Sequence, residues 1–144
     1  MLEGFAELLR LQFDIEAVTS APEVIYGLTP DLRLAFLNAG WHRFAAENGG
    51  EPQISQQWRV GRNLMEAIPS QLHDFYAKGF ARCIESREPW HHTYQCSSAE
   101  LLRWFRMTAF PLTGGRGLLV FHTLVVEIDS SNSRQTHAAI EAFY

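Results

Sequence analysis

The stretch VIYGLTPDLRLAFLN, residues 24–38, decides the fold because it is composed as two strands joined by a tight turn. Its second half alternates large apolar side chains with Arg33 and Ala35, which is the two-residue period of a half-buried strand. Pro30 and Asp31 stand between the two apolar runs and are typical turn residues. Residues 24–28 and 32–37 are therefore predicted to form an antiparallel hairpin.

Helical segments are predicted after the hairpin. Asn38 can accept hydrogen bonds from free backbone donors and so cap a short helix that ends at the glycines 49 and 50. Beyond a loop and a helical turn at 64–68, the longest helix is predicted to begin after Pro69, with Ser70 as its cap, and to end near residue 87. Its apolar residues recur at helical spacing and form one face: Leu72, Phe75, Tyr76, Gly79, Phe80, Cys83 and Ile84.

Three consecutive strands are predicted at residues 90–96, 101–112 and 117–128. The links at 97–100 and 113–116 are short enough for antiparallel hairpins. In the last strand both alternating sets are apolar, which predicts cover on both faces. The sets are Leu119, Phe121 and Val125 on one side, and Leu118, Val120, Leu124 and Val126 on the other.

An amphipathic helix is predicted at the N-terminus, over residues 2–17 and ending before Pro22. Either this helix or a second subunit must cover the second face of the last strand, because a bare apolar strand invites association. We expect a homodimer whose interface contains Leu2, Phe5, Leu9 and Phe13. The expected division is a dimerisation helix at 1–21, a domain at 22–128 and a linker or connector at 129–144.

Composition narrows the class of protein. The chain of 144 residues is 47% hydrophobic, with 10 Phe and 4 Trp, which is enough for one packed core. The net charge is −4 and the 12 basic residues are scattered, so nucleic acid is not expected as a partner. No run of about 18 apolar residues is present and no membrane association is expected. We expect a cytoplasmic protein, since Cys83 and Cys96 are too far apart for a local redox or zinc pair and suit a reducing compartment.

The order of several short motifs resembles that of a known family over about residues 22–128. The motifs are Ile25-Tyr26-Gly27-Leu28 with Pro30-Asp31 and Phe36-Leu37-Asn38, then Trp41-His42-Arg43-Phe44, Val60-Gly61-Arg62-Asn63, Ile68-Pro69, and Arg103-Trp104-Phe105-Arg106-Met107 with Pro111-Leu112. In this order they resemble a PAS domain. The resemblance implies an α+β fold, with a five-stranded antiparallel sheet in the order 2-1-5-4-3 and helices over one face that form a pocket. It also implies signal transduction, as the input module of a kinase, cyclase or transcription regulator of the bacterial type.

Aromatic residues are the candidates for lining this pocket, because small-molecule sites are mostly apolar with few polar anchors. The alternative is that they fill the core at normal density. The candidate ligand-binding residues are Phe36, Trp41, Phe44, Phe75, Tyr76, Phe80, Tyr94, Trp104, Phe105 and Phe121.

Cofactor binding remains open, and absence of a cofactor is the main expectation. His73 is a candidate haem ligand, since His73-Asp74-Phe75-Tyr76 resembles a motif of oxygen-sensing PAS proteins. Gly61-Arg62-Asn63 resembles the segment before the reactive cysteine of flavin-binding light sensors, but Leu64 takes the place of that cysteine. Adduct photochemistry is thus excluded if the segments correspond, whereas non-covalent flavin binding is not. A metal site between His92 and His122 is not expected.

Three functions are compatible with these observations. The first is a sensory or regulatory PAS module that binds a small ligand or a partner and signals through its dimer or its connector. The second is a ligand-free PAS domain for dimerisation or docking. The third is a small cone-shaped α+β isomerase or hydratase, which would need a buried acid or base that the sequence does not reveal. We therefore expect a protein that is not an enzyme.

Overall fold

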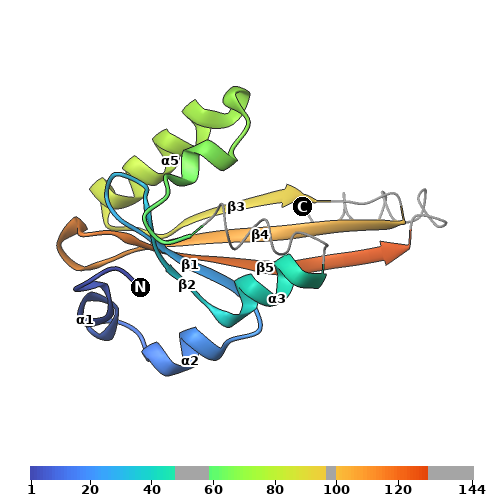
Figure 1. The fold of residues 1–144 in the computed structure, drawn as a ribbon. Coiled ribbons are helices and arrows are strands. Elements are labelled where there is room, and N and C mark those ends of the chain that lie inside the picture. The colour runs from blue at the N-terminus through green and yellow to red at the C-terminus, as the bar shows by residue number, and fades with distance from the viewer. Residues whose placement is uncertain (48–58, 97–99, 130–144) are drawn as a thin grey trace.

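Five antiparallel strands form one sheet in the order β2-β1-β5-β4-β3 in the computed structural model, which describes residues 1–47, 59–96 and 100–129 (Figure 1). The strands are β1 (Val24–Leu28), β2 (Leu34–Leu37), β3 (Trp90–Gln95), β4 (Leu101–Pro111) and β5 (Leu118–Asp129). The predicted α+β class, the sheet order and the strand positions are confirmed. The cone-shaped α+β alternative is not the architecture observed.

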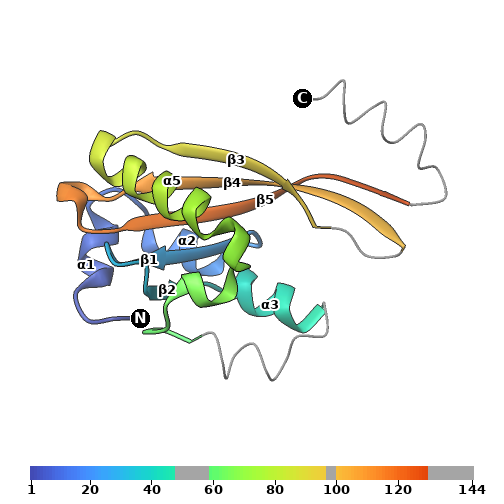
Figure 2. The ribbon, with the colours of Figure 1, turned by 90° about the horizontal axis from the view of Figure 1, so that it is seen from above.

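Helices cover both faces of the sheet. In Figure 1, α5 (His73–Ser86) lies above the sheet, whereas α1 (Phe5–Arg10) and α2 (Ile15–Ser20) lie below it. Seen from above, α5 runs along the sheet on the side of β3, β4 and β5 (Figure 2). The segment α3 (Ala39–Glu47) contacts β1, and the short 3-10 turns η1 (Leu64–Ala67) and η2 (Ser70–Leu72) lead into α5. A third 3-10 turn, η3 (Thr113–Gly115), joins β4 to β5.

Two of the predicted helices differ from those in the structure. The single helix expected over residues 2–17 is two short helices, because the Asp14 side chain caps α2 by accepting from the backbone N–H groups of Glu16 and Ala17, at 3.1 and 3.3 Å. The long helix begins at His73 and its N-cap is Leu72, whereas Ser70, the predicted cap, is the first residue of η2. Its end near residue 87 is confirmed, since Arg87 closes the helix in the left-handed conformation.

Asn38 joins the N-terminal segment to the sheet. Its side chain is 1% exposed, and its Oδ1 accepts from the backbone N–H groups of Ile25 (3.0 Å) and Trp41 (2.9 Å). Its Nδ2 donates to the carbonyl oxygens of Val18 (3.1 Å) and Glu23 (2.9 Å). The predicted capping of the helix after Asn38 is confirmed, and the same side chain also fixes the path from α2 into β1.

The N-terminal helices pack on their own sheet. Phe5, Leu8 and Leu9 are buried, and they belong to one apolar cluster with residues of the lower face of the sheet, among them Ile25 and Leu119. Leu9 is completely inaccessible to solvent. Phe5 and Leu9 are thus buried on the sheet of their own chain and are not available to the predicted dimer interface, whereas Leu2 and Phe13 are only partly buried and their place in an interface stays a prediction.

The upper face carries the larger apolar cluster. Phe80 and Cys83 of α5 are buried against side chains of β4 and β5, including Met107 and Val120. The place of Cys83 on the predicted apolar face of this helix is confirmed, and there it acts as a small core residue. Gly79 allows α5 to approach β3, since a Cβ atom at this position would collide with the Trp90 ring.

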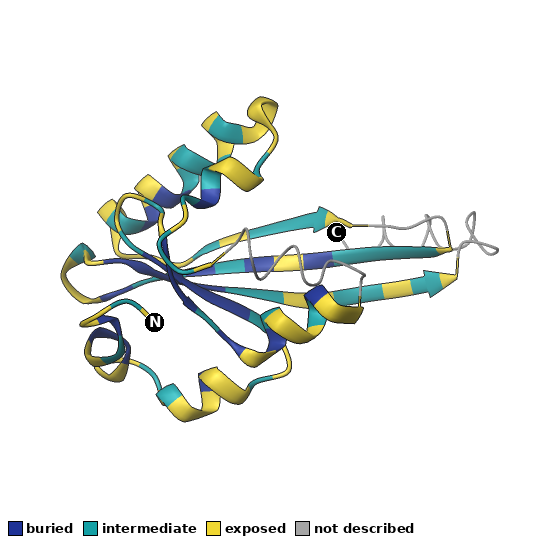
Figure 3. Ribbon diagram, in the orientation of Figure 1, coloured by how far each residue is buried: buried dark blue, intermediate teal, exposed yellow. Residues whose placement is uncertain are grey.

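The cover on β5 is incomplete along its length. Leu118, Leu119 and Val120 are fully buried, but Leu124 is 47% exposed, and the far ends of β4 and β5 are mostly intermediate or exposed (Figure 3). The register between the two strands shifts between Trp104 and Phe105, which breaks the strict alternation predicted up to Val126. Cover on both faces is therefore confirmed only for the first half of the strand.

Some predictions fall outside the described residues. These are the helix end at 49–50, the link at 97–99 and the connector at 130–144. Within the ranges that the structure does describe, no helix is long and apolar enough to cross a membrane.

Candidate ligand-binding pocket

An apolar pocket of about 260 Å³ lies between the upper face of the sheet and the segments α3 and η1. It receives side chains from β1, β3, β4 and β5 as well, so four of the five strands contribute to its wall. We call it the α3 pocket; its lining residues are Val24, Tyr26, Trp41, Phe44, Ala45, Leu64, Tyr94, Phe105 and His122. None of them is charged when His122 is neutral. This lining suits a small, mostly apolar molecule.

A second pocket of about 210 Å³ continues under η1, η2 and α5. We call it the α5 pocket, and its further lining residues include Tyr76, Phe80 and Met107. The two pockets share four lining residues, which are Tyr26, Leu64, Tyr94 and His122. The only polar side chains among these four are the histidine and the two tyrosines, so the polar part of the site lies where the pockets meet.

His122 is hydrogen-bonded to both tyrosines. Its Nε2 lies 2.8 Å from the Tyr26 hydroxyl and its Nδ1 lies 2.6 Å from the Tyr94 hydroxyl. The Tyr26 ring also stacks on the imidazole, with ring centroids 5.3 Å apart. The three side chains come from β1, β5 and β3, so this tyrosine-histidine-tyrosine relay spans the sheet across β4.

Burial sets the protonation states of the relay. Loss of hydration lowers the pKa of His122 to about 4, with a smaller contribution from the nearby His92, so the imidazole is neutral at pH 7. Burial also raises the pKa of Tyr26 and that of Tyr94. At neutral pH the relay therefore consists of an uncharged imidazole and two uncharged phenols.

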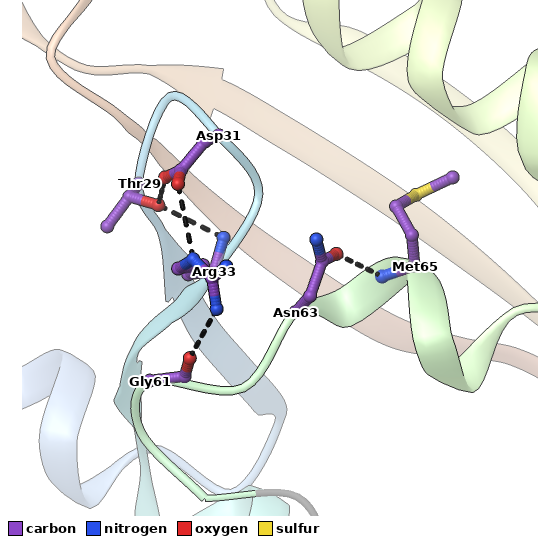
Figure 4. A network of polar contacts seen from close by, with 6 residues as sticks. All are labelled: Thr29, Asp31, Arg33, Gly61, Asn63 and Met65. Carbon is purple, nitrogen blue, oxygen red and sulfur yellow. Dashed lines mark hydrogen bonds and ion pairs between the residues drawn. The ribbon is translucent and has the colours of Figure 1, made fainter.

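Leu64 lines both pockets, and the chain on either side of it belongs to a polar network with the hairpin turn. Figure 4 shows this network. Arg33 bonds to the Asp31 carboxylate at 3.2 Å and to the Gly61 carbonyl at 3.1 Å, while Asn63 caps η1 by accepting from the backbone N–H of Met65 at 2.9 Å. The backbone N–H of Leu64 donates to the carbonyl of residue 32 at 2.9 Å. The hairpin turn thus holds the start of η1 against β2. The Asp31 pKa is lowered, chiefly by its hydrogen bond from Thr29 and further by Arg33.

A third pocket, of about 390 Å³, has a mixed lining beside the far end of β5. Arg43 and Arg103 line it together with Glu23, Glu47 and Glu127. The guanidinium of Arg103 lies 6.0 Å from the centre of the Phe44 ring. His122 and Phe44 belong to the linings of both this pocket and the α3 pocket, which places charged groups close to the apolar site without placing any in its wall.

The structure brings together six of the ten predicted pocket residues. Trp41, Phe44, Tyr94 and Phe105 line the α3 pocket, and Tyr76, Phe80 and Tyr94 line the α5 pocket. Phe75 is 46% exposed and packs edge-on against His92, at 4.8 Å between ring centroids. Trp104 lies on β4 opposite Val126 and lines none of these three pockets.

Phe36 and Phe121 lie on the lower face with α1, which corrects their assignment to the pocket. Phe36 was expected to share a face with Leu34. The register between β1 and β2 changes from Gly27–Phe36 to Leu28–Leu34, so one residue of β2 is bulged and the two side chains point to opposite faces. Phe121 follows Leu119, whose side chain faces α1.

Tyr26, Leu64 and His122 are pocket residues that sequence reasoning did not assign. His122 was considered only as a possible metal partner of His92. His92 on β3 and His122 on β5 both lie opposite Met107 of β4, which stands between them, so the two histidines are two strands apart. No group of three or more potential metal ligands occurs in the part of the chain that the structure describes. The sequence feature that could have identified His122 is its spacing of two and four residues from Val120 and Leu118, which places all three side chains on the same face of the strand.

The residues present do not fit a haem ligated by His73. The His73 Nε2 lies 2.6 Å from the carbonyl oxygen of Ile68, and His73 lines neither the α3 nor the α5 pocket. Leu64 lines both pockets, so an aliphatic side chain stands in the wall at the position that resembles the reactive cysteine of flavin-binding sensors.

Comparison with known proteins identifies the fold. No protein-family model and no curated protein matches the sequence. The PAS domain of Bordetella pertussis BvgS is similar with a TM-score of 0.57 and 17% identity, over 92% of this chain and 98% of that one. The phage VqmA-DPO complex gives a TM-score of 0.57 and 15% identity, over 97% of this chain and 62% of that one. A domain of an HTR-like protein from Haloarcula marismortui gives 0.51 and 15%, over 74% and 100%. The chain has the PAS fold, as the order of its motifs predicted.

Proposed function

We propose that this chain is a sensory module that binds a small, mostly apolar molecule in the α3 pocket. The observation that carries the proposal is an apolar pocket of about 260 Å³ whose wall contains the neutral tyrosine-histidine-tyrosine relay. A fully packed core would leave no such space and would favour the ligand-free alternative. That one protein of this fold is described as a complex, VqmA with DPO, adds support.

The relay provides a route from the pocket to the sheet. A ligand that bonds to either tyrosine competes with or reorders the bonds at His122, which belongs to β5. β5 pairs with β1 on one side and with β4 on the other, so a displacement of β5 at His122 would act on both neighbouring strands. The chemistry of the relay is that of binding, since the described lining residues include no charged acid or base, and we propose no enzymatic reaction.

The proposal extends to a homodimer or a regulatory protein partner in the cytoplasm. Outside the face of the sheet that α1 covers, three large apolar side chains are 44 to 47% exposed and could supply contact area: Leu72, Phe75 and Leu124. Sedimentation over a range of protein concentrations tests the dimer. A single monomeric species at high concentration would refute it and would leave a partner of another kind.

The ligand is tested on the full chain in two steps. An absorption spectrum and mass spectrometry of the denatured protein identify any molecule that co-purifies. A screen of small neutral aromatic compounds by two-dimensional amide NMR then follows shifts around the pocket. Ala45 is 4% exposed in the pocket wall, so Ala45→Phe fills the space and should abolish these shifts. Ala46 is exposed on the same helix, and Ala46→Phe is the matched control.

Shifts that cluster at the pocket and disappear only in Ala45→Phe are the expected result. The proposal is wrong if no compound shifts pocket residues at millimolar concentration and nothing co-purifies. In that case a ligand-free docking or dimerisation domain is the remaining account of the fold.

A further inference from the structure

The relay contains one more N–H or O–H hydrogen than its two hydrogen bonds require. A neutral imidazole carries a single N–H and a single acceptor nitrogen, and each tyrosine carries one O–H. Three hydrogens are thus available for the two bonds that join Tyr26, His122 and Tyr94. Whichever nitrogen is protonated, one tyrosine donates to the ring and the other accepts from it. The accepting tyrosine keeps its own O–H, for which no partner occurs among the described residues.

Burial decides which tyrosine keeps the hydrogen. Tyr26 is 4% exposed, and an unpaired donor there would lose its hydration without compensation. Both tyrosines line both pockets, but Tyr94 is less deeply buried than Tyr26. The favoured order is therefore Tyr26 O–H to Nε2, then Nδ1–H to the Tyr94 oxygen. This order leaves the Tyr94 O–H as a donor at the junction of the two pockets.

A second donor belongs to the same wall. The indole Nε1 of Trp41 is buried and has no hydrogen-bond partner within residues 1–47, 59–96 and 100–129. Buried donors in folded proteins are nearly always paired, so an unpaired one beside a cavity calls for an acceptor from outside the chain. Trp41 packs edge-on against Tyr26, at 5.7 Å between ring centroids, and so lies next to the relay.

We infer that the α3 pocket selects an uncharged molecule with an apolar or aromatic body and a hydrogen-bond acceptor, a carbonyl oxygen or ring nitrogen, that accepts from the Tyr94 hydroxyl. This inference rests on the proposed function and adds the chemical class of the ligand. An isolated anion is disfavoured, because none of the described residues of the wall carries a positive charge to replace its water. A molecule that can only donate is disfavoured as well, since it would leave the Tyr94 O–H without an acceptor.

Acetophenone and α-methylstyrene test the inference, because they differ only by a carbonyl oxygen in place of a methylene group. Amide NMR titrations of the full chain should give an affinity about tenfold higher for acetophenone, the value of one net hydrogen bond. In Tyr94→Phe the preference for acetophenone over α-methylstyrene should fall below about twofold. Benzoate should bind more weakly than acetophenone. Equal affinity for acetophenone and α-methylstyrene in the unmodified chain, or tighter binding of benzoate, refutes the inference and leaves the proposed function standing. Binding of neither neutral probe overturns the inference, and the screen and the co-purification experiment then decide the proposed function separately.

The tautomer of His122 provides a test that needs no ligand and no variant at Tyr94. In protein labelled with ¹⁵N-histidine, two-bond correlations distinguish a protonated Nδ1 from a protonated Nε2, and His122→Gln assigns the signal. A protonated Nδ1 is expected. A protonated Nε2 would mean that Tyr94 donates to the ring, which contradicts the inference directly. Tyr26→Phe should shift the ring toward this second tautomer and should also reduce the preference for acetophenone, although Tyr94 is intact.

Discussion

Acid should destabilise this protein through His122. In the unfolded chain the imidazole binds a proton with a pKa of 6.5, whereas burial lowers the pKa in the folded protein to about 4. The unfolded state therefore takes up a proton first as the pH falls, and stability that is present above pH 6.5 is lost on the way down to pH 4. Below pH 4 both states are protonated and the loss levels off.

The size of the effect follows from the two pKa values. Their difference of about 2.5, at about 1.4 kcal/mol for each pKa unit, corresponds to about 3 kcal/mol in full. Between pH 7 and pH 4.5 the expected loss from His122 is about 2.5 kcal/mol. This is a large share of the 5 to 15 kcal/mol that is typical of a domain.

Urea unfolding at several pH values measures this loss, with His122→Gln as the reference. The glutamine amide can donate to one tyrosine and accept from the other without titrating, so its profile contains every other ionisable group, His92 included. The difference between the two profiles should grow by about 2.5 kcal/mol over the stated range. Parallel profiles would refute the reasoning, as would an NMR titration of the His122 ring with a midpoint near 6.5.

Three further predictions concern packing. Leu9→Ala should lower the free energy of unfolding by about 2 to 5 kcal/mol, because it opens a cavity between α1 and the sheet, whereas Leu11→Ala, at a 62% exposed position, should change it by less than about 0.5 kcal/mol. Equal small effects in denaturant unfolding would show that α1 does not cover the sheet. Asn38→Leu should cost about 3 kcal/mol by leaving buried backbone groups unpaired; a loss below about 1 kcal/mol would contradict the network described. Gly79→Ala should cost about 1 to 3 kcal/mol and alter the near-ultraviolet circular dichroism of Trp90, and an unchanged spectrum would argue against this close contact.

The fold could be predicted because its elements have clear periodicity. The alternation in residues 32–37 and the helical spacing from Leu72 to Ile84 each predict an element, and the order of elements predicts the sheet. Two bulges could not be predicted, since they depend on backbone pairing between strands. One of them moves Phe36 to the lower face, and the other interrupts the alternation before Val126. Asp14 lies inside the helix predicted at the N-terminus, so its role as the N-cap of a second helix could not be predicted before α2 was known to begin after it.

The site was predictable as a set of aromatic residues but not as a relay. Trp41, Phe44 and Phe105 could be assigned to a pocket because they lie on apolar faces. The pairing of Tyr26 and Tyr94 with His122 depends on the register of three different strands, which no single segment encodes. The pKa of His122 depends in turn on that assembly, because burial is the main cause of its change.

The far end of β5, where few side chains are buried, extends a long way from the relay. From His122 to Asp129 the strand rises about 3.3 Å per residue, so its tip stands about 23 Å from the imidazole. Over such an arm, a change of about 5° in strand direction at His122 displaces the tip by about 2 Å. If the proposed ligand makes or breaks a bond at one hydroxyl of the relay and so turns the strand, the movement at the tip would be comparable to the length of a hydrogen bond, at a point where few side chains are buried.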